Sequence, residues 1–196
     1  NAEEDSRLSD DDTKEIVLRV SDSSGVASSD EIRLGMSDSA SDNFIYGEDE
    51  YNLESYVNPD YLDMYFIKND WIGYQDINGV IAETPNFARI LSSNNEDLKI
   101  YNIKTSHRGV ANSVDLTWDL DAGIDTDLHI IINDVVYNLK DMNSLEVKIL
   151  DLENMILVVG DVNEYMLPDE FALGLPYPNP FNPITSIDLS ITEDTN

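Results

Sequence analysis

The stretch Leu128-His129-Ile130-Ile131-Ile132-Asn133-Asp134-Val135-Val136-Tyr137-Asn138-Leu139 predicts a β-hairpin. Two runs rich in β-branched residues are separated only by Asn133 and Asp134, which favour the tight turns that join antiparallel strands. The rest of the chain has to fit a sheet that contains this hairpin.

The other apolar runs of the chain fit the strand period of two better than the helical period, and Val114–Leu120 alternates cleanly with polar residues. These runs are Ile16–Val20, Ile32–Leu34, Tyr61–Ile67, Leu98–Ile103, Val114–Leu120, Leu145–Leu150 and Met155–Val159. Short strands that recur about every 8 to 12 residues, without a helical stripe, are typical of β-sandwiches. We therefore expect an all-β chain with an antiparallel, Ig-like β-sandwich.

The chain of 196 residues divides into three parts by composition. Residues 1–13 form a flexible acidic leader, and residues 14–167 hold the sandwich. Residues 168–196 are a proline-rich spacer followed by an extra strand. The polar run Asn94-Asn95-Glu96-Asp97 leaves open a division of the sandwich region into two sub-domains.

Charge excludes several classes of partner. The chain has 40 acidic and 11 basic residues and a net charge of −29, so nucleic acid and anionic membranes would repel it. Cysteine is absent, which rules out disulfides and thiolate metal sites. No transmembrane stretch or signal peptide is found, and the start at Asn1 resembles a processed terminus.

The most unusual segment is Leu-Pro-Tyr-Pro-Asn-Pro-Phe-Asn-Pro, residues 175–183. Proline fixes φ, removes a backbone donor and favours extended geometry in the residue before it. We expect a stiff extended ribbon that delivers the alternating strand Ser186–Ile191.

This tail resembles the opening of the C-terminal sorting domain of bacterial type IX secretion, and also that of the Ig-like domain of flagellar hook-capping proteins. The resemblance rests on Phe171-Ala172-Leu173, on Tyr177–Pro183 and on Thr185, Ile187 and Leu189. It implies a β-sandwich module, export by the type IX machinery and a place outside the cell or on the bacterial cell surface. Members of these families continue for several more strands, whereas this sequence stops at Asn196.

An unfinished module leaves two uses for its strand. The strand can add to a sheet edge of a second copy, or it can fold back onto its own domain as an edge strand. Repeated addition of copies head to tail would form a filament. The residues expected to take part are Pro178, Pro180, Phe181, Pro183, Ile187, Leu189 and Ile191.

Five aspartates around Gly123 form a candidate metal site. They are Asp115, Asp119, Asp121, Asp125 and Asp127. The first three share one strand face, and a turn at Gly123 would fold the other two back toward them. Clustered carboxylates suit calcium, although the spacing is not that of an EF-hand. The alternative is a solvated strand face and an acidic turn.

Aromatic residues concentrate between Phe44 and Tyr74, which holds nine of the 17 in the chain. Exposed aromatic side chains stack on sugar rings or serve protein interfaces. Tyr46, Tyr51, Tyr56 and Trp71 are the candidates for such a surface. For Trp71 a place in the core is the favoured interpretation.

Signals of catalysis are weak. The two histidines are His107, in a turn, and His129, in an apolar strand, and no nucleophile elbow, phosphate loop or HExxH motif is found. We expect a non-catalytic chain that requires no cofactor.

Two functional hypotheses follow. The first is a secreted structural or adhesive protein of a bacterial cell surface, whose partners are the secretion machinery and other copies of itself in an extracellular filament. The second is a calcium-assisted carbohydrate-binding module of a larger secreted enzyme, with a glycan as its partner.

Overall fold

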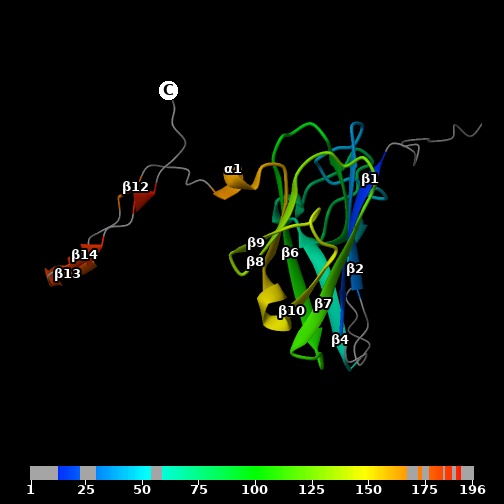
Figure 1. Cartoon of the computed structure of the whole chain (residues 1–196). Coiled ribbons are helices and arrows are strands. Elements are labelled where there is room, and N and C mark those ends of the chain that lie inside the picture. Colours follow the sequence, from blue (N-terminus) through cyan, green and yellow to red (C-terminus); the bar gives the residue numbers. More distant parts are fainter. Residues whose placement is uncertain are drawn as a thin grey trace, which may run out of the picture. The chain divides into compact units, whose positions relative to one another are not determined.

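The alternating sequence folds into a single curled β-sheet (Figure 1). The computed structural model of the chain describes residues 13–22, 30–53, 59–166, 172–173, 177–182, 184–186 and 189–190. The contacts between residues divide the chain into two units, Asn1–Gly160 and Asp161–Asn196.

All eleven strands of the first unit belong to one sheet. They are β1 (Lys14–Ser21), β2 (Asp30–Ser37), β3 (Glu50–Tyr51), β4 (Tyr61–Ile67), β5 (Asn86–Ser93), β6 (Lys99–Arg108), β7 (Ser113–Leu120), β8 (Leu128–Ile132), β9 (Val135–Asn138), β10 (Ser144–Lys148) and β11 (Met155–Val159). Two 3-10 helices accompany them, η1 (Asn69–Trp71) and η2 (Ile149–Glu153).

In the described residues of the second unit there are one short helix and four short strands. They are α1 (Val162–Met166), β12 (Ala172–Leu173), β13 (Tyr177–Asn182), β14 (Ile184–Ser186) and β15 (Leu189–Ser190). β12 pairs with β15, and β13 pairs with β14. Of the residues expected to join copies, Pro183, Ile187 and Ile191 lie outside the described residues.

The prediction of an all-β fold is confirmed. In β7, for example, Val114, Leu116 and Trp118 are buried, while Asp115 and Asp119, at alternate positions, are exposed, as the period of two requires.

The sheet differs from the expected antiparallel sandwich in two ways. The strand order is β10-β7-β1-β2-β5-β4-β6-β11-β8-β9, one continuous path instead of two separate sheets, so an Ig-like sandwich is not confirmed. The pair β2–β5 is parallel, whereas the expectation was antiparallel pairing throughout. The chain between Ser37 and Asn86 crosses over to reach this pairing, and it includes β3 and β4 on the way.

The predicted hairpin is confirmed as β8–β9. Asn133 and Asp134 have φ angles of 50° and 63° and join Ile132 to Val135 directly. Two successive residues with positive φ are the mark of a type I′ turn, whose twist matches that of the flanking strands.

The curled sheet closes around one core. Residues 139–143 lead from β9, at one end of the strand path, to β10 at the other. On the way, the Trp118 indole N–H in β7 donates to the Leu139 and Met142 carbonyls at 2.8 and 2.9 Å. β6, which follows the loop 94–97, pairs with β4, which precedes it, so strands on both sides of the loop belong to one sheet.

An aromatic cluster fills the core beside β5. Phe44, Tyr51, Trp71 and Phe87 have ring centroids 5.0 to 6.0 Å apart. Trp71 is only 3% exposed, so it belongs to the core and cannot offer its ring to a ligand. Among the described residues, no helix is both long and apolar enough to span a membrane.

Candidate functional site

One end of the sheet is a strand edge that has no partner among the described residues. Within them, β9 pairs only with β8. In an antiparallel pair, hydrogen-bonded and non-hydrogen-bonded residue pairs alternate. The bond from the Leu139 N–H to the Leu128 carbonyl (2.9 Å) shows that these two residues form a hydrogen-bonded pair. Counting along the register, Val136 and Asn138 belong to non-hydrogen-bonded pairs. The N–H and C=O groups of Val136 and Asn138 therefore point away from β8.

This edge has no charged side chain. Its residues are Val135, Val136, Tyr137 and Asn138, and half of the Val135 surface is exposed. β10, at the other end of the path, has Glu146 and Lys148 exposed at its outward-facing positions. Charged residues on an edge strand discourage pairing with another chain. β10 has this protection and β9 lacks it.

A second hairpin, residues 72–82, lies between β4 and β5. Backbone bonds of 2.8 to 3.0 Å hold its two arms together. They run from the Gly73 N–H to the Ala82 carbonyl, from the Ala82 N–H to the Tyr74 carbonyl and from the Asp76 N–H to the Val80 carbonyl. Ala82 and Trp71, next to the hairpin, are buried and anchor it to the core.

The 72–82 hairpin shows no charge at its surface. Its one charged residue, Asp76, is 6% exposed and accepts the N–H groups of Tyr46, Asn78 and Val80 at 2.7 to 3.0 Å. Desolvation alone would raise the pKa of Asp76, but these three hydrogen bonds outweigh it and hold the pKa below its usual value. The carboxylate thus serves as an internal tie between the hairpin and Tyr46.

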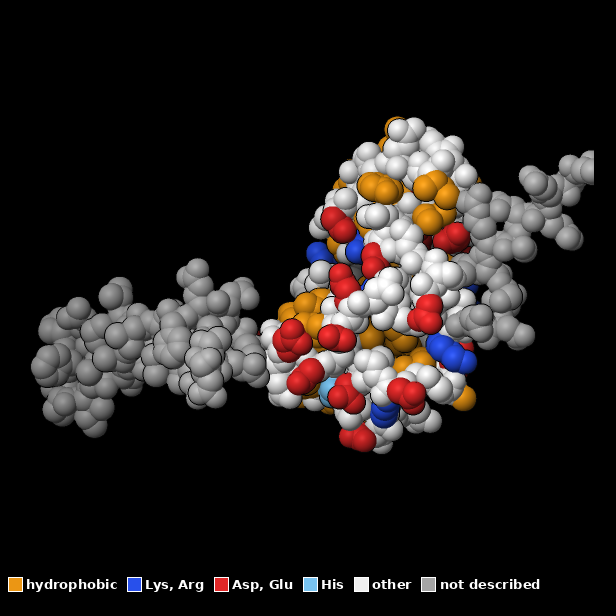
Figure 2. Space-filling model, turned by 90° about the horizontal axis from the view of Figure 1, so that it is seen from above, with side chains coloured by type: hydrophobic (Ala, Val, Ile, Leu, Met, Phe, Trp, Pro, Cys, Tyr) orange, Lys and Arg blue, Asp and Glu red, His pale blue; other side chains and the backbone are white. Residues whose placement is uncertain are grey.

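Large apolar side chains reach solvent on this hairpin. Of the eleven such side chains in the described part of the chain, four belong to it, namely Ile72, Tyr74, Ile77 and Ile81. Ile77, near the tip, is 70% exposed, and the neighbouring Tyr46 is 57% exposed. Figure 2 shows hydrophobic side chains at the surface among acidic ones on the face seen from above. A group of exposed apolar residues rimmed by polar ones marks an interaction site more often than chance exposure does.

The expected aromatic surface is only partly formed. Tyr46 is exposed, as that hypothesis requires, whereas Tyr51 is half-buried and stacks on Phe87 with 5.0 Å between ring centroids. Trp71 is a core residue, and Tyr56 lies outside the described residues. Sequence reasoning missed Tyr74 and the three isoleucines of the hairpin, because isolated apolar residues in a turn-rich segment have no strand or helix period.

The predicted aspartate cluster is dispersed. Asp115 and Asp119 share the exposed face of β7, but four residues along a strand separate them by about 13 Å. The guanidinium of Arg19 pairs with Asp119, and the carboxylate of Asp121 accepts the Glu15 N–H at 2.9 Å.

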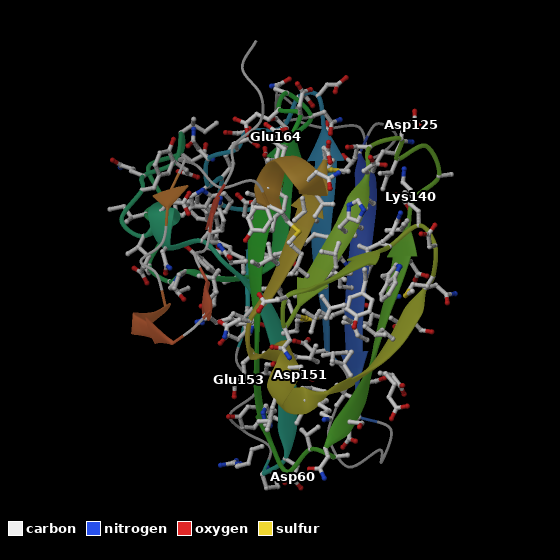
Figure 3. All side chains as sticks on the ribbon, turned by 60° about the vertical axis from the view of Figure 1, so that its left-hand side comes forward. Asp60, Asp125, Lys140, Asp151, Glu153 and Glu164 are labelled. Atoms are coloured by element: carbon white, nitrogen blue, oxygen red, sulfur yellow. The ribbon has the colours of Figure 1, made fainter. Side chains whose placement is uncertain are left out.

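The last two aspartates of the cluster use their main-chain oxygens. The Asp127 carbonyl accepts the Gly160 N–H at 2.8 Å, and the Asp125 carbonyl accepts the Lys140 ammonium at 3.0 Å. Figure 3 shows Asp125 and Lys140 close together at one end of the sheet. Within the described ranges, no three acidic or histidine side chains come together as metal ligands would.

Asp49 is a buried acid beneath the Tyr46 segment. It is 3% exposed, and its oxygens accept the N–H groups of Ile45 and Leu91 at 2.8 and 2.9 Å. Desolvation outweighs these hydrogen bonds and raises the pKa of Asp49 to about 6. The position of Tyr46 therefore depends on two buried aspartates, Asp49 and Asp76.

A polar network surrounds Lys99 at the start of β6. The nearly buried ammonium donates to Asp42, Ser92 and Ser93 at 2.5, 3.1 and 2.9 Å. Partial burial would raise the pKa of Asp42, but hydrogen bonds from Lys99 and the two serines outweigh it and hold the pKa far below its usual range. The Tyr101 hydroxyl completes the network by donating to Ser92 at 2.7 Å.

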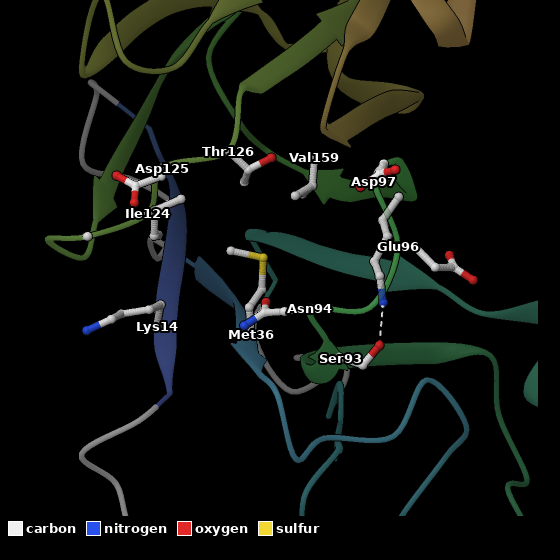
Figure 4. Close-up of a pocket in the computed structure, with 12 residues that line it drawn as sticks. Lys14, Met36, Ser93, Asn94, Glu96, Asp97, Ile124, Asp125, Thr126 and Val159 are labelled. Carbon is white, nitrogen blue, oxygen red and sulfur yellow. Dashed lines mark hydrogen bonds between the residues drawn. The ribbon is translucent and has the colours of Figure 1, made fainter.

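This network borders a cavity of about 310 Å³. Figure 4 shows Ser93, Glu96 and Asp97 among its lining residues, with Met36 and Val159 from the core strands. A serine beside a lysine can form a nucleophile and base pair, but a base needs a free lone pair. All three N–H bonds of Lys99 point to acceptors, so this arrangement serves to hold the loop after β2 against β5 and β6.

Comparison of the chain with protein-family models, with curated proteins and with solved structures finds no match.

Proposed function

We propose that this chain is a secreted, non-catalytic structural or adhesive protein of a bacterial cell surface, whose copies join by strand addition into a filament. The sorting-type motif at residues 171–189 supports export by the type IX machinery. The uncharged, unpaired edge of β9 is the observation that carries the proposal.

Strand addition fits this edge because the edge offers main-chain donors and acceptors. Val136 directs both backbone groups outward, and an incoming strand would pair with them, whereas the Asn138 carbonyl already accepts the Asp141 N–H at 3.3 Å. The strand Ser186–Ile191 supplies such a partner, since its apolar residues alternate with polar ones. Leu189 and Ser190 pair with Leu173 and Ala172 of their own chain, so addition to a second copy has to replace this short pairing. Specificity would come from the side chains at every second position.

Charge favours the same edge. Each copy has a net charge of −29, so most faces of two copies repel each other. Contacts between copies are favoured where few carboxylates meet. β9 presents none, and the strand Ser186–Ile191 has one, Asp188. The half-exposed Val135 adds apolar area to the contact.

The test is a proline on the outward-facing positions of the two edges. Val136→Pro removes an N–H that β8 does not use, so the β8–β9 pairing survives. The matched control is Glu146→Pro, which removes an equivalent outward N–H from β10, because the Ile149 N–H bond to the Asn112 carbonyl places Glu146 in the non-hydrogen-bonded set.

The measurement is sedimentation velocity of the full chain over a range of concentrations. We expect the wild type and Glu146→Pro to associate, and Val136→Pro to stay monomeric with an unchanged circular dichroism spectrum. A wild type that is monomeric at every concentration, or a Val136→Pro variant that associates normally, would overturn the proposal.

The second candidate is a carbohydrate-binding module that uses calcium, and the exposed rings of Tyr46 and Tyr74 favour it. The surrounding isoleucines weigh against it, because they cannot form hydrogen bonds with sugar hydroxyls. If this function holds, a glycan in an affinity gel will retard the wild type, and Tyr46→Ala will abolish the retardation.

A further inference from the structure

We infer that the 72–82 hairpin, together with Tyr46, is the docking site for the uncharged proline-rich segment of a second copy, residues 171–187. This inference rests on the proposed function, since it names a second contact between the copies that strand addition joins. It concerns a surface far in sequence from β9 and is tested separately from it.

The first argument is the neutrality of the hairpin. Residues 72–82 contain one charge in a chain in which 26% of residues are charged, and that charge, on Asp76, is buried and bonded to three N–H groups. Ile81 and Gln75, which face each other across the hairpin, are exposed, and Asp76 and Ala82 are its buried residues. The outward face therefore offers apolar groups and a neutral amide.

The second argument is the rigidity of that face. The backbone hydrogen bonds between the two arms, and the bond from the Tyr46 N–H to the Asp76 carboxylate, hold this surface in place without a partner. A surface that is already ordered loses little entropy on binding, which raises affinity for a given contact area.

The third argument is the matching neutrality of the tail. Residues 171–187 contain no charged side chain, although the chain has 40 acidic residues. In this respect the segment matches the 72–82 hairpin. Between copies that repel each other, two neutral surfaces are the pair that can approach without bringing carboxylates together.

The fourth argument is the chemistry of proline recognition. Prolines at positions 176, 178, 180 and 183 favour an extended backbone whose ordering costs little entropy on binding. Surfaces that bind such segments present aromatic rings and apolar side chains to the proline rings. Tyr46, Tyr74 and Ile77 provide groups of this kind.

One experiment compares two exposed apolar residues. Ile77→Asp places a carboxylate on the hairpin, and Leu150→Asp places one on η2, at a residue of nearly equal exposure (70% and 68%). Both variants gain the same charge. By sedimentation velocity of the full chain, we expect Ile77→Asp to raise the dissociation constant of self-association at least tenfold and Leu150→Asp to change it less than twofold.

The outcomes separate this inference from the proposed function. If Val136→Pro abolishes association while Ile77→Asp behaves like Leu150→Asp, the hairpin is not a contact and only this inference fails. If the wild type does not associate, both fail. A loss of association in Ile77→Asp alone supports docking on the hairpin and overturns strand addition on β9.

A cross-link identifies the occupant, because the chain has no cysteine of its own. One preparation carries Ile77→Cys and the other Asn179→Cys, and the two are mixed and oxidised. A disulfide-linked heterodimer is the expected product, and a mixture of Leu150→Cys with Asn179→Cys should give none. Equal yields from the two mixtures, or a disulfide that forms only within single chains carrying both Ile77→Cys and Asn179→Cys, would overturn docking of the tail of a second copy.

Discussion

Asp49 makes the stability of the first unit depend on pH. Its pKa in the folded chain, about 6, lies above the ordinary value of 3.8 because the carboxyl is desolvated. A raised pKa means that the folded state binds the proton more tightly than the unfolded state. The stabilisation from this proton is complete below about pH 3.8 and is lost as the pH rises through about 6.

The comparison with Asp49→Asn isolates this effect, since the other titrating groups cancel in the difference. We expect the free energy of unfolding of the wild type to fall by about 2 to 3 kcal/mol relative to the variant between pH 4 and pH 8. Urea denaturation at several pH values measures it. Parallel curves for the two proteins would show that Asp49 titrates normally.

Lys99 offers a second prediction at the residue scale. Lys99→Met removes the donor shared by Asp42, Ser92 and Ser93, and we expect the free energy of unfolding to fall by about 2 kcal/mol. Lys104→Met, an exposed position on the same strand, should change it by less than about 0.5 kcal/mol. Thermal and urea unfolding of both variants measure the two changes. Equal losses of unfolding free energy in Lys99→Met and Lys104→Met would show that the network does not stabilise the fold.

The acid pH dependence of this network has the opposite sign to that of Asp49. The pKa of Asp42 is lowered by its hydrogen bonds, so its stabilisation is present above about pH 3.8 and is lost as the pH falls below that value. In Lys99→Met we expect this acid-side loss to shrink, which denaturation below pH 4 would detect.

Sequence patterns predict the burial of single residues only where a period is present. Val114, Leu116 and Trp118 follow the strand period and are buried as expected. Asp49 and Lys99 are polar residues in the core, and no local pattern reveals them, because each depends on a partner distant in sequence, Leu91 for Asp49 and Asp42 for Lys99.

At the scale of elements, the type I′ turn permits a stabilising change. Asp134 has φ of 63°, a region that costs most residues with side chains about 1 kcal/mol and costs glycine nothing. We expect Asp134→Gly to raise the free energy of unfolding by about 0.5 kcal/mol. The control Asp141→Gly removes the same charge from a turn residue without positive φ and should lower it. Thermal melts that rank the two in reverse order would contradict this account.

The hairpin β8–β9 could be predicted because both strands and their turn are adjacent in sequence. The parallel pairing of β2 with β5 could not, since Arg33 and Arg89 become neighbours only through the crossover between them. The position of β9 at the end of the sheet could not be predicted from the sequence either. Which strand lies at the end of a sheet depends on the order of all the strands.

At the scale of the whole molecule, net charge governs stability in salt. The acidic side chains that give the net charge of −29 repel one another, and salt shortens the range of that repulsion to about 10 Å at 0.1 M. We expect the melting temperature to rise by several degrees between about 20 mM and about 500 mM NaCl. A melting temperature independent of salt would show that bound counterions already neutralise the acidic surface.

Calcium at matched ionic strength separates screening from binding. If Asp115 to Asp127 hold a calcium ion in the native state, CaCl₂ must raise the melting temperature more than NaCl does, because a ligand of the native state alone stabilises it. Since the aspartates are dispersed, we expect equal melting temperatures. A larger rise in calcium that Asp121→Asn removes would restore the metal hypothesis.

The alternation of apolar and polar residues predicted the fold class but not the architecture. Alternation specifies which face of a strand is buried, so the all-β class follows from it. Strand order depends on which remote faces fit, and a boundary at residues 94–97 was plausible until β4 and β6 proved to be neighbours.

The place of β1 in the sheet also determines when the chain can fold. β1 lies between β2 and β7, and its contact from Arg19 to Asp119 joins residues 100 positions apart. During synthesis, one edge of β1 has no partner strand until Ser113–Leu120 has left the ribosome. Contacts between residues so far apart in sequence form slowly even after that. The order of the strands therefore delays completion of the sheet until most of the first unit has been synthesised.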